Sequence, residues 1–193
     1  MQWRPGRNKE AMQDPLDGQI IGLLGSEDGR RRAFDLLVKA YNRRIYWHVR
    51  RLVNAHEDAD DVVQNTFIKV WENLHRYRGE ARVYTWLYRI ASNEALNYLR
   101  SAARRSTLTL AEEEEQMEGS YSDAGGPEGE EIIQRLEAAI RRLPDKQRLV
   151  FNLKYYEEMK YEEMAEVTGT SVGALKASYH HAVKKIEEYL NGD

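Results

Sequence analysis

The chain has 193 residues, 41% of them hydrophobic and 32% charged, with no cysteine and a formal net charge of -3. A chain of this length buries one or two modest cores and leaves little room for an elaborate enzyme, while the absence of cysteine excludes disulfides and thiolate zinc sites. Its apolar runs are far shorter than a membrane span, and the segment from Met1 to Asp14 lacks the apolar core of a secretory signal, so we expect a cytoplasmic protein.

Helical periodicity dominates the first half of the chain. After an N-terminal extension, residues 1–15, the segment from Leu16 to Leu24 predicts a small helix. Apolar residues then recur at steps of three and four, as along one side of a helix. They form three sets: Phe34, Leu37, Val38, Tyr41, Ile45, Val49 and Leu52; then Ala59, Val62, Val63, Phe67, Val70 and Leu74; then Leu87, Ile90, Ala91 and Tyr98. No strand-like alternation competes, so residues 16–105 are predicted to form an all-helical bundle.

The third of these helices also carries a polar face. Residues at steps of three and four combine an aromatic ring, two guanidinium groups and two amides: Trp86, Arg89, Asn93, Asn97 and Arg100. Just before it, residues 77–85 contain a glycine and break the periodicity, which predicts a loop carrying aromatic and cationic side chains.

Such a surface suits nucleic acid. Arginine pairs with phosphate, amides read base edges, and aromatic rings stack on unpaired bases at roughly 1 to 3 kcal/mol each. For any single residue the simpler interpretation is structural, with Tyr84, Trp86 and Tyr88 in the core and the arginines on a solvated surface. For the face as a set, we favour nucleic-acid binding.

An acidic segment follows the bundle. Residues 76–105 contain seven arginines and two glutamates, whereas residues 111–131 contain nine acids and no base. This acidic stretch has several glycines and almost no apolar side chains, so burial cannot offset the entropy lost on ordering it. A flexible acidic linker is therefore predicted over residues 106–130, between separate folding units at 16–105 and 131–193. Composition alone favours a solubilising spacer.

The second unit is predicted to contain a helix-turn-helix. Pro144 stands where the first turn of a helix tolerates proline, and that helix runs toward Tyr156. Tyr161, Met164, Ala165 and Val167 form the apolar stripe of the next helix, Thr168-Gly169-Thr170 forms a tight break, and Ser171 is a good N-cap for a last helix.

The last helix has two distinct sides. Its core side consists of Val172, Leu175, Tyr179, Ala182, Ile186 and Leu190, and its opposite side of Gly173, Lys176, Ala177, His180 and Lys184. Small residues near the N-cap let a helix approach the major groove, where Lys176 and Lys184 meet phosphates or base edges. An ordinary helical hairpin without a ligand has the same pattern, so this signal alone leaves both alternatives open.

Longer motifs carry a family resemblance. Three stretches resemble the second conserved region of sigma-70 family proteins: residues 59–67 (ADDVVQNTF), 77–80 (YRGE) and 85–91 (TWLYRIA) followed by Asn93. Three later stretches resemble the fourth region: Leu143-Pro144, residues 161–165 (YEEMA) and 170–176 (TSVGALK). The most similar group is the extracytoplasmic-function (ECF) sigma factors, and the resemblance extends from Leu16 to Leu190.

The resemblance implies roles for the first unit. In this family the helix with the acidic motif docks on the clamp coiled coil of the largest RNA polymerase subunit, and the matching positions here are Asp60, Asp61, Gln64, Asn65 and Phe67. The following loop and helix melt the minus-10 promoter element and hold a flipped base. Their matching positions are Tyr77, Arg78, Tyr84, Trp86, Arg89, Asn93 and Asn97.

The resemblance also implies that the last helix reads the minus-35 element in duplex DNA. The corresponding positions are Ser171, Gly173, Ala174, Lys176, Ala177, Ser178, His180 and His181. Family members commonly have arginines where this chain has Ser178, His181 and Val183, so we expect weak DNA binding without polymerase. Ala177 and Ser178 then read bases by apolar contact and hydroxyl hydrogen bonds. The acidic linker resembles the segment that enters the polymerase near nascent RNA, where an acidic chain mimics RNA.

On this interpretation the protein is not an enzyme and needs no cofactor or metal, because the polymerase supplies the chemistry. The expected partners are core RNA polymerase, promoter DNA that is single-stranded at minus-10 and duplex at minus-35, and an anti-sigma factor, with no small-molecule substrate. Nothing in the sequence identifies the anti-sigma factor, the stimulus or the genes controlled.

Two alternatives remain. Residues 56–61 (HEDADD) suggest a metal-dependent hydrolase, yet no second histidine lies at helical ligand spacing, and His180 and His181 point about 100° apart on a helix. Those acids are more simply a helix start, where carboxylates favour the positive end of the dipole. A helix-turn-helix repressor with a helical sensor domain would bind DNA unaided, but it leaves the aromatic and basic surface over residues 77–100 unexplained.

Overall fold

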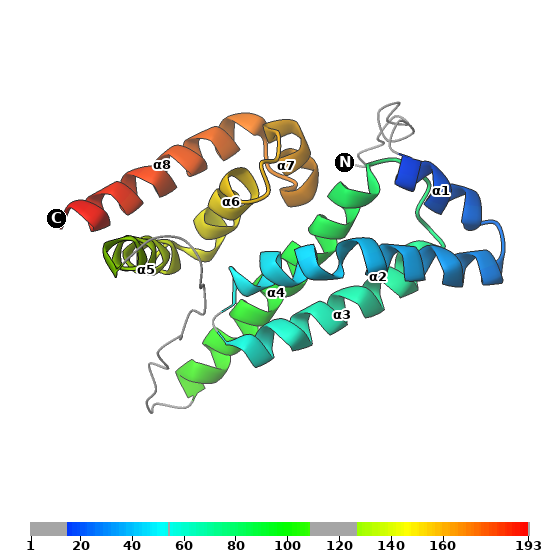
Figure 1. Ribbon diagram of the computed structural model, residues 1–193, viewed down its shortest axis with the longest axis horizontal. Helices are drawn as coiled ribbons and strands as arrows, with labels where there is room; N and C mark the ends of the chain where they lie inside the picture. Colours follow the sequence, from blue (N-terminus) through cyan, green and yellow to red (C-terminus); the bar gives the residue numbers. More distant parts are fainter. Residues whose placement is uncertain (1–14, 54, 109–126, 193) are drawn as a thin grey trace. The chain divides into compact units, whose positions relative to one another are not determined.

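The structure is a computed structural model that describes residues 15–53, 55–108 and 127–192. Within these ranges the chain forms eight α-helices and no β-strand (Figure 1), so the predicted all-α class is confirmed. Most of the predicted acidic linker, residues 109–126, lies outside the described residues, as does nearly all of the predicted N-terminal extension.

The described residues divide into two compact units. The first holds α1 (Pro15–Leu23), α2 (Glu27–Arg50), α3 (His56–Leu74), and α4 (Val83–Leu108) as far as Asn97. The second holds the rest of α4, α5 (Pro127–Arg141), α6 (Asp145–Tyr155), α7 (Tyr161–Thr168) as far as Ala165, and α8 (Val172–Asn191).

Helix extends into both ends of the predicted linker. α4 continues to Leu108, because residues 101–108 contain neither glycine nor proline to stop it. α5 begins at Pro127, a residue that the first turn of a helix accommodates because the N–H that proline lacks has no intrahelical partner there. The predicted boundaries at 105 and 131 therefore fall inside helices.

The core of the first unit is the seam along which α2 and α3 pack (Figure 1). All six apolar residues predicted for α3 are buried, and so are five of the seven predicted for α2, while Phe34 and Val38 are half-buried. Phe34 meets the edges of Phe67 and Trp71 at centroid distances of 6.3 and 5.4 Å. The periodicity therefore identified the packed side of both helices.

A buried polar pair joins α2 to α4. His48 is fully buried, and its Nε2 lies 3.0 Å from the hydroxyl oxygen of Ser92 on α4. Burial, followed by the positive charge of Arg51, lowers the pKa of His48 to about 3. The imidazole is therefore neutral at physiological pH, and the hydrogen bond fixes one facing position of the two helices.

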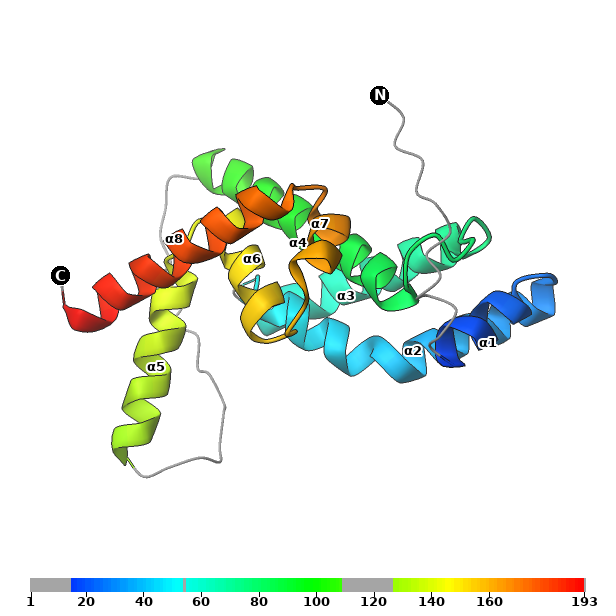
Figure 2. The same ribbon diagram turned by 90° about the horizontal axis from the view of Figure 1, so that it is seen from above.

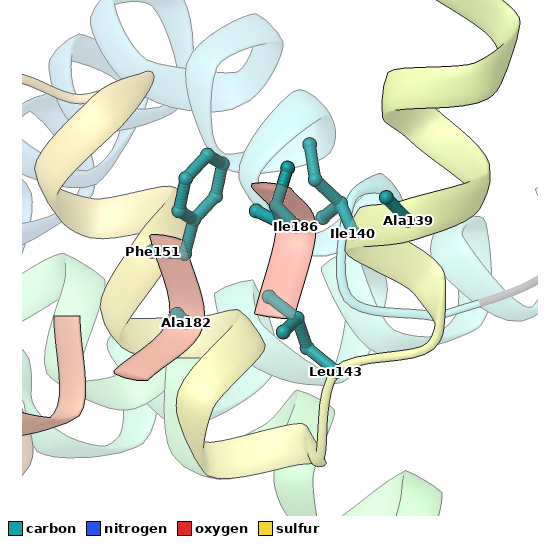
Figure 3. Close-up of a cluster of buried hydrophobic side chains, with 6 residues drawn as sticks. All are labelled: Ala139, Ile140, Leu143, Phe151, Ala182 and Ile186. Carbon is teal, nitrogen blue, oxygen red and sulfur yellow. The ribbon is translucent and has the colours of Figure 1, made fainter. Parts of the chain in front are cut away.

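The second unit is built around α8, which packs against both α5 and α6 (Figure 2). Figure 3 shows its core, in which side chains of α5, α6, α8 and the turn after α5 meet: Ala139, Ile140, Leu143, Phe151, Ala182 and Ile186. Arg148 lies buried at the junction of α5 and α6, where it donates to Asp145 Oδ1 at 2.9 Å and to the carbonyl of Arg141 at 3.4 Å. This arginine supplies a hydrogen bond to the end of α5.

Candidate nucleic-acid interface

The predicted polar stripe on α4 is present. Its members are half-buried at the start of the helix and exposed further along: Trp86 and Arg89, then Asn93, Asn97 and Arg100. The opposite side of the helix is buried through Leu87, Tyr88, Ala91 and Ala95. Core packing therefore fixes the rotation of α4 and directs the arginines and amides away from the bundle.

The loop before α4 is shorter than predicted. It covers residues 75–82, because α4 begins at Val83 and the amide of Trp86 already donates to the carbonyl of Arg82 at 3.0 Å. Tyr84 and Thr85 are therefore helical, which corrects the expectation of a loop up to residue 85. At its turn Gly79 has a φ of +71°, a conformation that favours glycine.

Hydrogen bonds inside the loop hold its polar side chains. The Tyr77 hydroxyl donates to the carbonyl of Ala81 at 2.6 Å, and Arg78 Nη1 donates to the carbonyl of His75 at 2.7 Å. Tyr77 is buried, and this burial together with the negative charge of Asp17 raises the pKa of its phenol. The phenol therefore stays a proton donor. Arg78 is exposed, with its guanidinium folded back on the loop backbone.

The aromatic residues fall into two groups. Trp86 packs on Tyr77, with ring centroids 5.1 Å apart. Tyr84 lies two residues earlier, about 200° around the helix. There it contacts Tyr88 at 4.5 Å and the guanidinium of Arg44, on α2, at 5.1 Å. The structure therefore brings Tyr77 and Trp86 together but places Tyr84 on the side of α2.

Arg44 is a residue that the sequence reasoning missed. It is exposed on α2 and covers the Tyr84 ring with its guanidinium. The available signal was its place next to Arg43, on the polar side of a helix whose apolar stripe includes Tyr41 and Ile45. Periodicity alone does not say which neighbouring element such a cation meets.

α3 presents a second candidate surface. Four of its five predicted residues are exposed: Asp60, Asp61, Gln64 and Asn65. The fifth, Phe67, is 8% exposed and packs against Phe34, so the structure does not bring it to this face. Ile68, which was not predicted, is 49% exposed next to the amides. The surface thus combines acids and amides with one apolar side chain.

α8 presents the third candidate surface. Ser171 caps the helix, since its hydroxyl accepts from the amide of Ala174 at 3.3 Å. Most predicted positions are exposed, namely Ser171, Gly173, Ala174, Lys176, Ala177, His180 and His181, while Ser178 is half-buried. Behind them Leu175, Ala182 and Ile186 are buried, so the predicted division of the helix into two sides is confirmed.

Positive charge on α8 is partly engaged. The ammonium group of Lys176 lies 5.6 Å from the ring centroid of Tyr161 on α7, and that of Lys184 lies 3.7 Å from Glu188 Oε1. The glycine between the two helices, Gly169, has a φ of +67° and makes the turn. Of the two predicted lysines, Lys176 thus contacts α7 of the helix-turn-helix, whereas Lys184 pairs with an acid on its own helix.

The acidic motif at the start of α3 forms a local pair. His56 Nδ1 lies 3.1 Å from Asp60 Oδ2, one helical turn away, and both side chains are exposed. Among the described residues, no group of three or more His, Cys, Asp or Glu side chains is placed to hold a metal ion. No helix in the described part of the chain has the length and apolar character needed to cross a bilayer.

Two family models match these units. The model of Sigma-70 region 2 matches residues 37–105, which include α3, the loop and the polar stripe of α4. The model of Sigma-70, region 4 matches residues 133–186, which include the helix-turn-helix. The class that these matches define is a sigma-70-type transcription factor with regions 2 and 4.

Curated relatives identify the group. The RNA polymerase sigma-H factor of Pseudomonas aeruginosa is 37% identical, over 90% of this chain and 93% of that protein. The ECF RNA polymerase sigma-E factors of Haemophilus influenzae and Escherichia coli are each 36% identical, over 85% and 91% of this chain and 90% and 95% of their own. The chain belongs to the extracytoplasmic-function group of the sigma-70 family of RNA polymerase sigma factors.

Solved structures have the same fold. CnrH, in complex with the cytosolic domain of CnrY, has a TM-score of 0.65 at 25% identity and covers 92% of this chain and 96% of its own. The sigma factor RpoE of Bartonella quintana, in complex with the anti-sigma factor NepR, has a TM-score of 0.67 at 22% identity and covers 83% of this chain and 98% of its own.

Proposed function

We propose that this sigma factor acts through three separate surfaces, on α3, α4 and α8. The stripe on α4 and the loop before it open the minus-10 element. The observation that carries the proposal is the stripe itself, in which Trp86 packs against Tyr77 with tilted rings and is followed by exposed amides at Asn93 and Asn97. An aromatic platform with adjacent amides and cations suits an unpaired base and its phosphate.

Core polymerase binds the exposed side of α3. Asp60, Asp61, Gln64 and Asn65 offer acceptors to basic partner residues, and Ile68 adds an apolar contact among them. Phe67 serves this surface indirectly, because its packing on Phe34 holds α3 against α2.

α8 reads the upstream duplex. Its N-terminal turn exposes Gly173, Ala174 and Ala177, which are small enough to let the backbone approach a groove. Lys176 is the main cation of this turn and contacts phosphate or a base edge, whereas Lys184 shares its charge with Glu188. So few cations make the unaided affinity of α8 for DNA low.

The protein works with other macromolecules and performs no catalysis of its own. The polymerase supplies the chemistry, so the chain needs no cofactor, metal or small-molecule substrate and acts in the cytoplasm with the polymerase. An anti-sigma factor regulates it by covering these surfaces. The similar structure of RpoE with the anti-sigma factor NepR supports this last proposal.

Reconstitution with core RNA polymerase tests the proposal. Transcription of a fragmented genomic library, with and without this protein, should yield new start sites that share an upstream and a minus-10 motif. Asp61→Arg should abolish co-purification with core polymerase, whereas Asp35→Arg, on the exposed side of α2, serves as the matched charge reversal and should leave it intact. An intact fold that binds promoter DNA unaided and ignores polymerase would favour the repressor alternative.

A further inference from the structure

The start of α4 is capped from a distant part of the chain. Asp17 on α1 is 1% exposed, and its Oδ2 accepts a hydrogen bond from the amide of Val83 at 3.1 Å, across 66 residues of sequence. Val83 is the first residue of α4, where amides lack intrahelical partners. A carboxylate at this end satisfies a donor and favours the positive end of the helix dipole. By contrast, α2 and α8 take their caps from the adjacent Ser26 and Ser171.

α1 also packs on the loop that precedes α4. A Cβ placed on Gly79 would lie 2.7 Å from Ile21 Cδ1, so the side chain of α1 rests directly on the backbone of the turn. Asp17 is near enough to Tyr77 that its charge contributes to raising the pKa of the phenol. Ile21 thus contacts the turn of the loop, and Asp17, one helical turn earlier on α1, contacts the first residue of α4.

The cost of burying a carboxylate explains why this contact is specific. An ionised carboxylate taken out of water is strongly destabilising unless it is hydrogen-bonded or paired. One compensating donor here is the first amide of α4, so the position of the helix start contributes to satisfying Asp17.

We propose that α1 is a positioning element for promoter opening, in which Asp17 and Ile21 hold the loop at residues 75–82 and the first turn of α4 ready to capture an unpaired minus-10 base. The inference rests on the proposed function of the α4 stripe and extends it to a helix that precedes the matched region 2, residues 37–105. Asp17 is buried behind the surface and touches no DNA itself. It acts through the position of Val83 and of Trp86, one turn further on.

Three variants separate the parts of this role. Asp17→Asn keeps the shape and an acceptor oxygen but removes the charge, and Asp17→Ala removes both. Asp35→Ala, an exposed acid on α2, is the matched control. Thermal unfolding of each variant establishes that it folds, and because Asn is nearly isosteric with Asp, Asp17→Asn keeps the test available if Asp17→Ala does not fold.

The first measurement is amide hydrogen exchange in the free protein. Asp17→Ala should raise exchange at Val83 and through residues 75–82 by about tenfold, with Asp17→Asn intermediate, while amides in the centres of α2 and α3 keep their wild-type rates. A uniform rise across α2 and α3 would indicate a general loss of stability and would overturn the positioning role. Unchanged exchange at Val83 would overturn it as well.

The second measurement is binding of the holoenzyme to a single-stranded oligonucleotide that carries the minus-10 motif. Asp17→Ala should weaken it about fivefold to tenfold, while affinity for core polymerase is unchanged. Wild-type affinity in Asp17→Ala, together with raised exchange at Val83, would overturn the inference and leave the proposed function intact. Failure of the wild-type holoenzyme to bind this strand would overturn the proposed function of the α4 stripe, and the positioning role would fall with it.

Discussion

The helices α4 and α8 both present a polar side to DNA in our proposal, yet they are held in different ways. α8 is defined locally, because Ser171 caps it and Gly169 makes the turn before it. α4 depends on distant residues, because its first amide is held by Asp17 and its middle is tied to His48 through Ser92. The start of α8 is therefore set by residues adjacent in the sequence, whereas the start of α4 is set by tertiary contacts.

The difference suits the two tasks. Reading duplex DNA requires a rigid helix that fits a groove already formed, whereas capturing a base from a melting duplex requires a surface whose parts come together in one arrangement. We therefore expect that substitutions in the residues of α1 and α2 that hold α4 change promoter opening and leave the binding of α8 to the upstream duplex unaltered.

The largest expected effect comes from Trp86→Ala. Loss of the ring removes a stacking platform worth about 1 to 3 kcal/mol, which corresponds to roughly a fivefold to 150-fold slower opening of a duplex promoter. Affinity for core polymerase should be unchanged. Stopped-flow detection of strand opening with a labelled promoter measures the first quantity, and titration of labelled core polymerase the second. Equal losses of both activities would contradict the separation of α4 from α3.

Gly79→Ala should be next in size. Alanine at a φ of +71° with its Cβ 2.7 Å from Ile21 Cδ1 should destabilise the first unit by about 1 to 2 kcal/mol. Ile21→Val removes the clashing atom, so the double variant should recover part of the loss, and chemical denaturation of all three variants gives the coupling. The same loss in both backgrounds would show that the backbone angle alone causes it.

Acid should weaken the first unit through His48. Burial lowers the pKa of His48 in the folded state to about 3, whereas in the unfolded chain it has the ordinary histidine value of about 6.5. The folded state is therefore most stable above pH 6.5, where His48 is neutral in both states. This stability is lost as pH falls through the window between the two values, by at most about 1.4 kcal/mol for each pH unit. The free energy of unfolding of wild type and of His48→Gln, measured between these pH values, isolates the contribution of His48, because all other titratable groups are the same in the two proteins. Parallel curves for the two proteins would contradict it.

Lys176→Ala should have the smallest effect and should sharpen the contrast. Loss of one phosphate contact should weaken holoenzyme binding to the upstream duplex a few fold and should reduce the salt dependence by about 0.9 in the slope of log K against log salt. Opening of a promoter that is already bound should keep its wild-type rate. A change in the opening rate with unaltered duplex affinity would assign Lys176 to another step.

Local patterns in the sequence predicted what local physics determines. The steps of three and four identified the buried side of α3 without error, and Ser171 marked the start of α8 because a hydroxyl caps the amide three residues later. The acidic composition before residue 131 concealed the first turn of α5, because glutamates and glycines typical of a linker also occur at the start of a helix.

What the sequence could not predict depends on distant contacts. The loop was expected to reach Thr85, but the carboxylate of Asp17 and the carbonyl of Arg82 allow α4 to begin at Val83. That shift also places Tyr84 toward Arg44 on α2. Phe67 belonged to both the apolar stripe and the family motif for polymerase binding, and only its packing on Phe34 shows that the first role uses its side chain.

The pair of Trp86 and Tyr77 gives the protein an intrinsic optical probe. With the ring centroids 5.1 Å apart, excitation energy passes efficiently from the tyrosine to the indole, and the emission of Trp86 depends on their contact. A nucleobase that stacks on the indole would quench this emission. With Trp3, Trp47 and Trp71 replaced by phenylalanine, fluorescence would follow the capture of a promoter base in real time without a dye on the DNA.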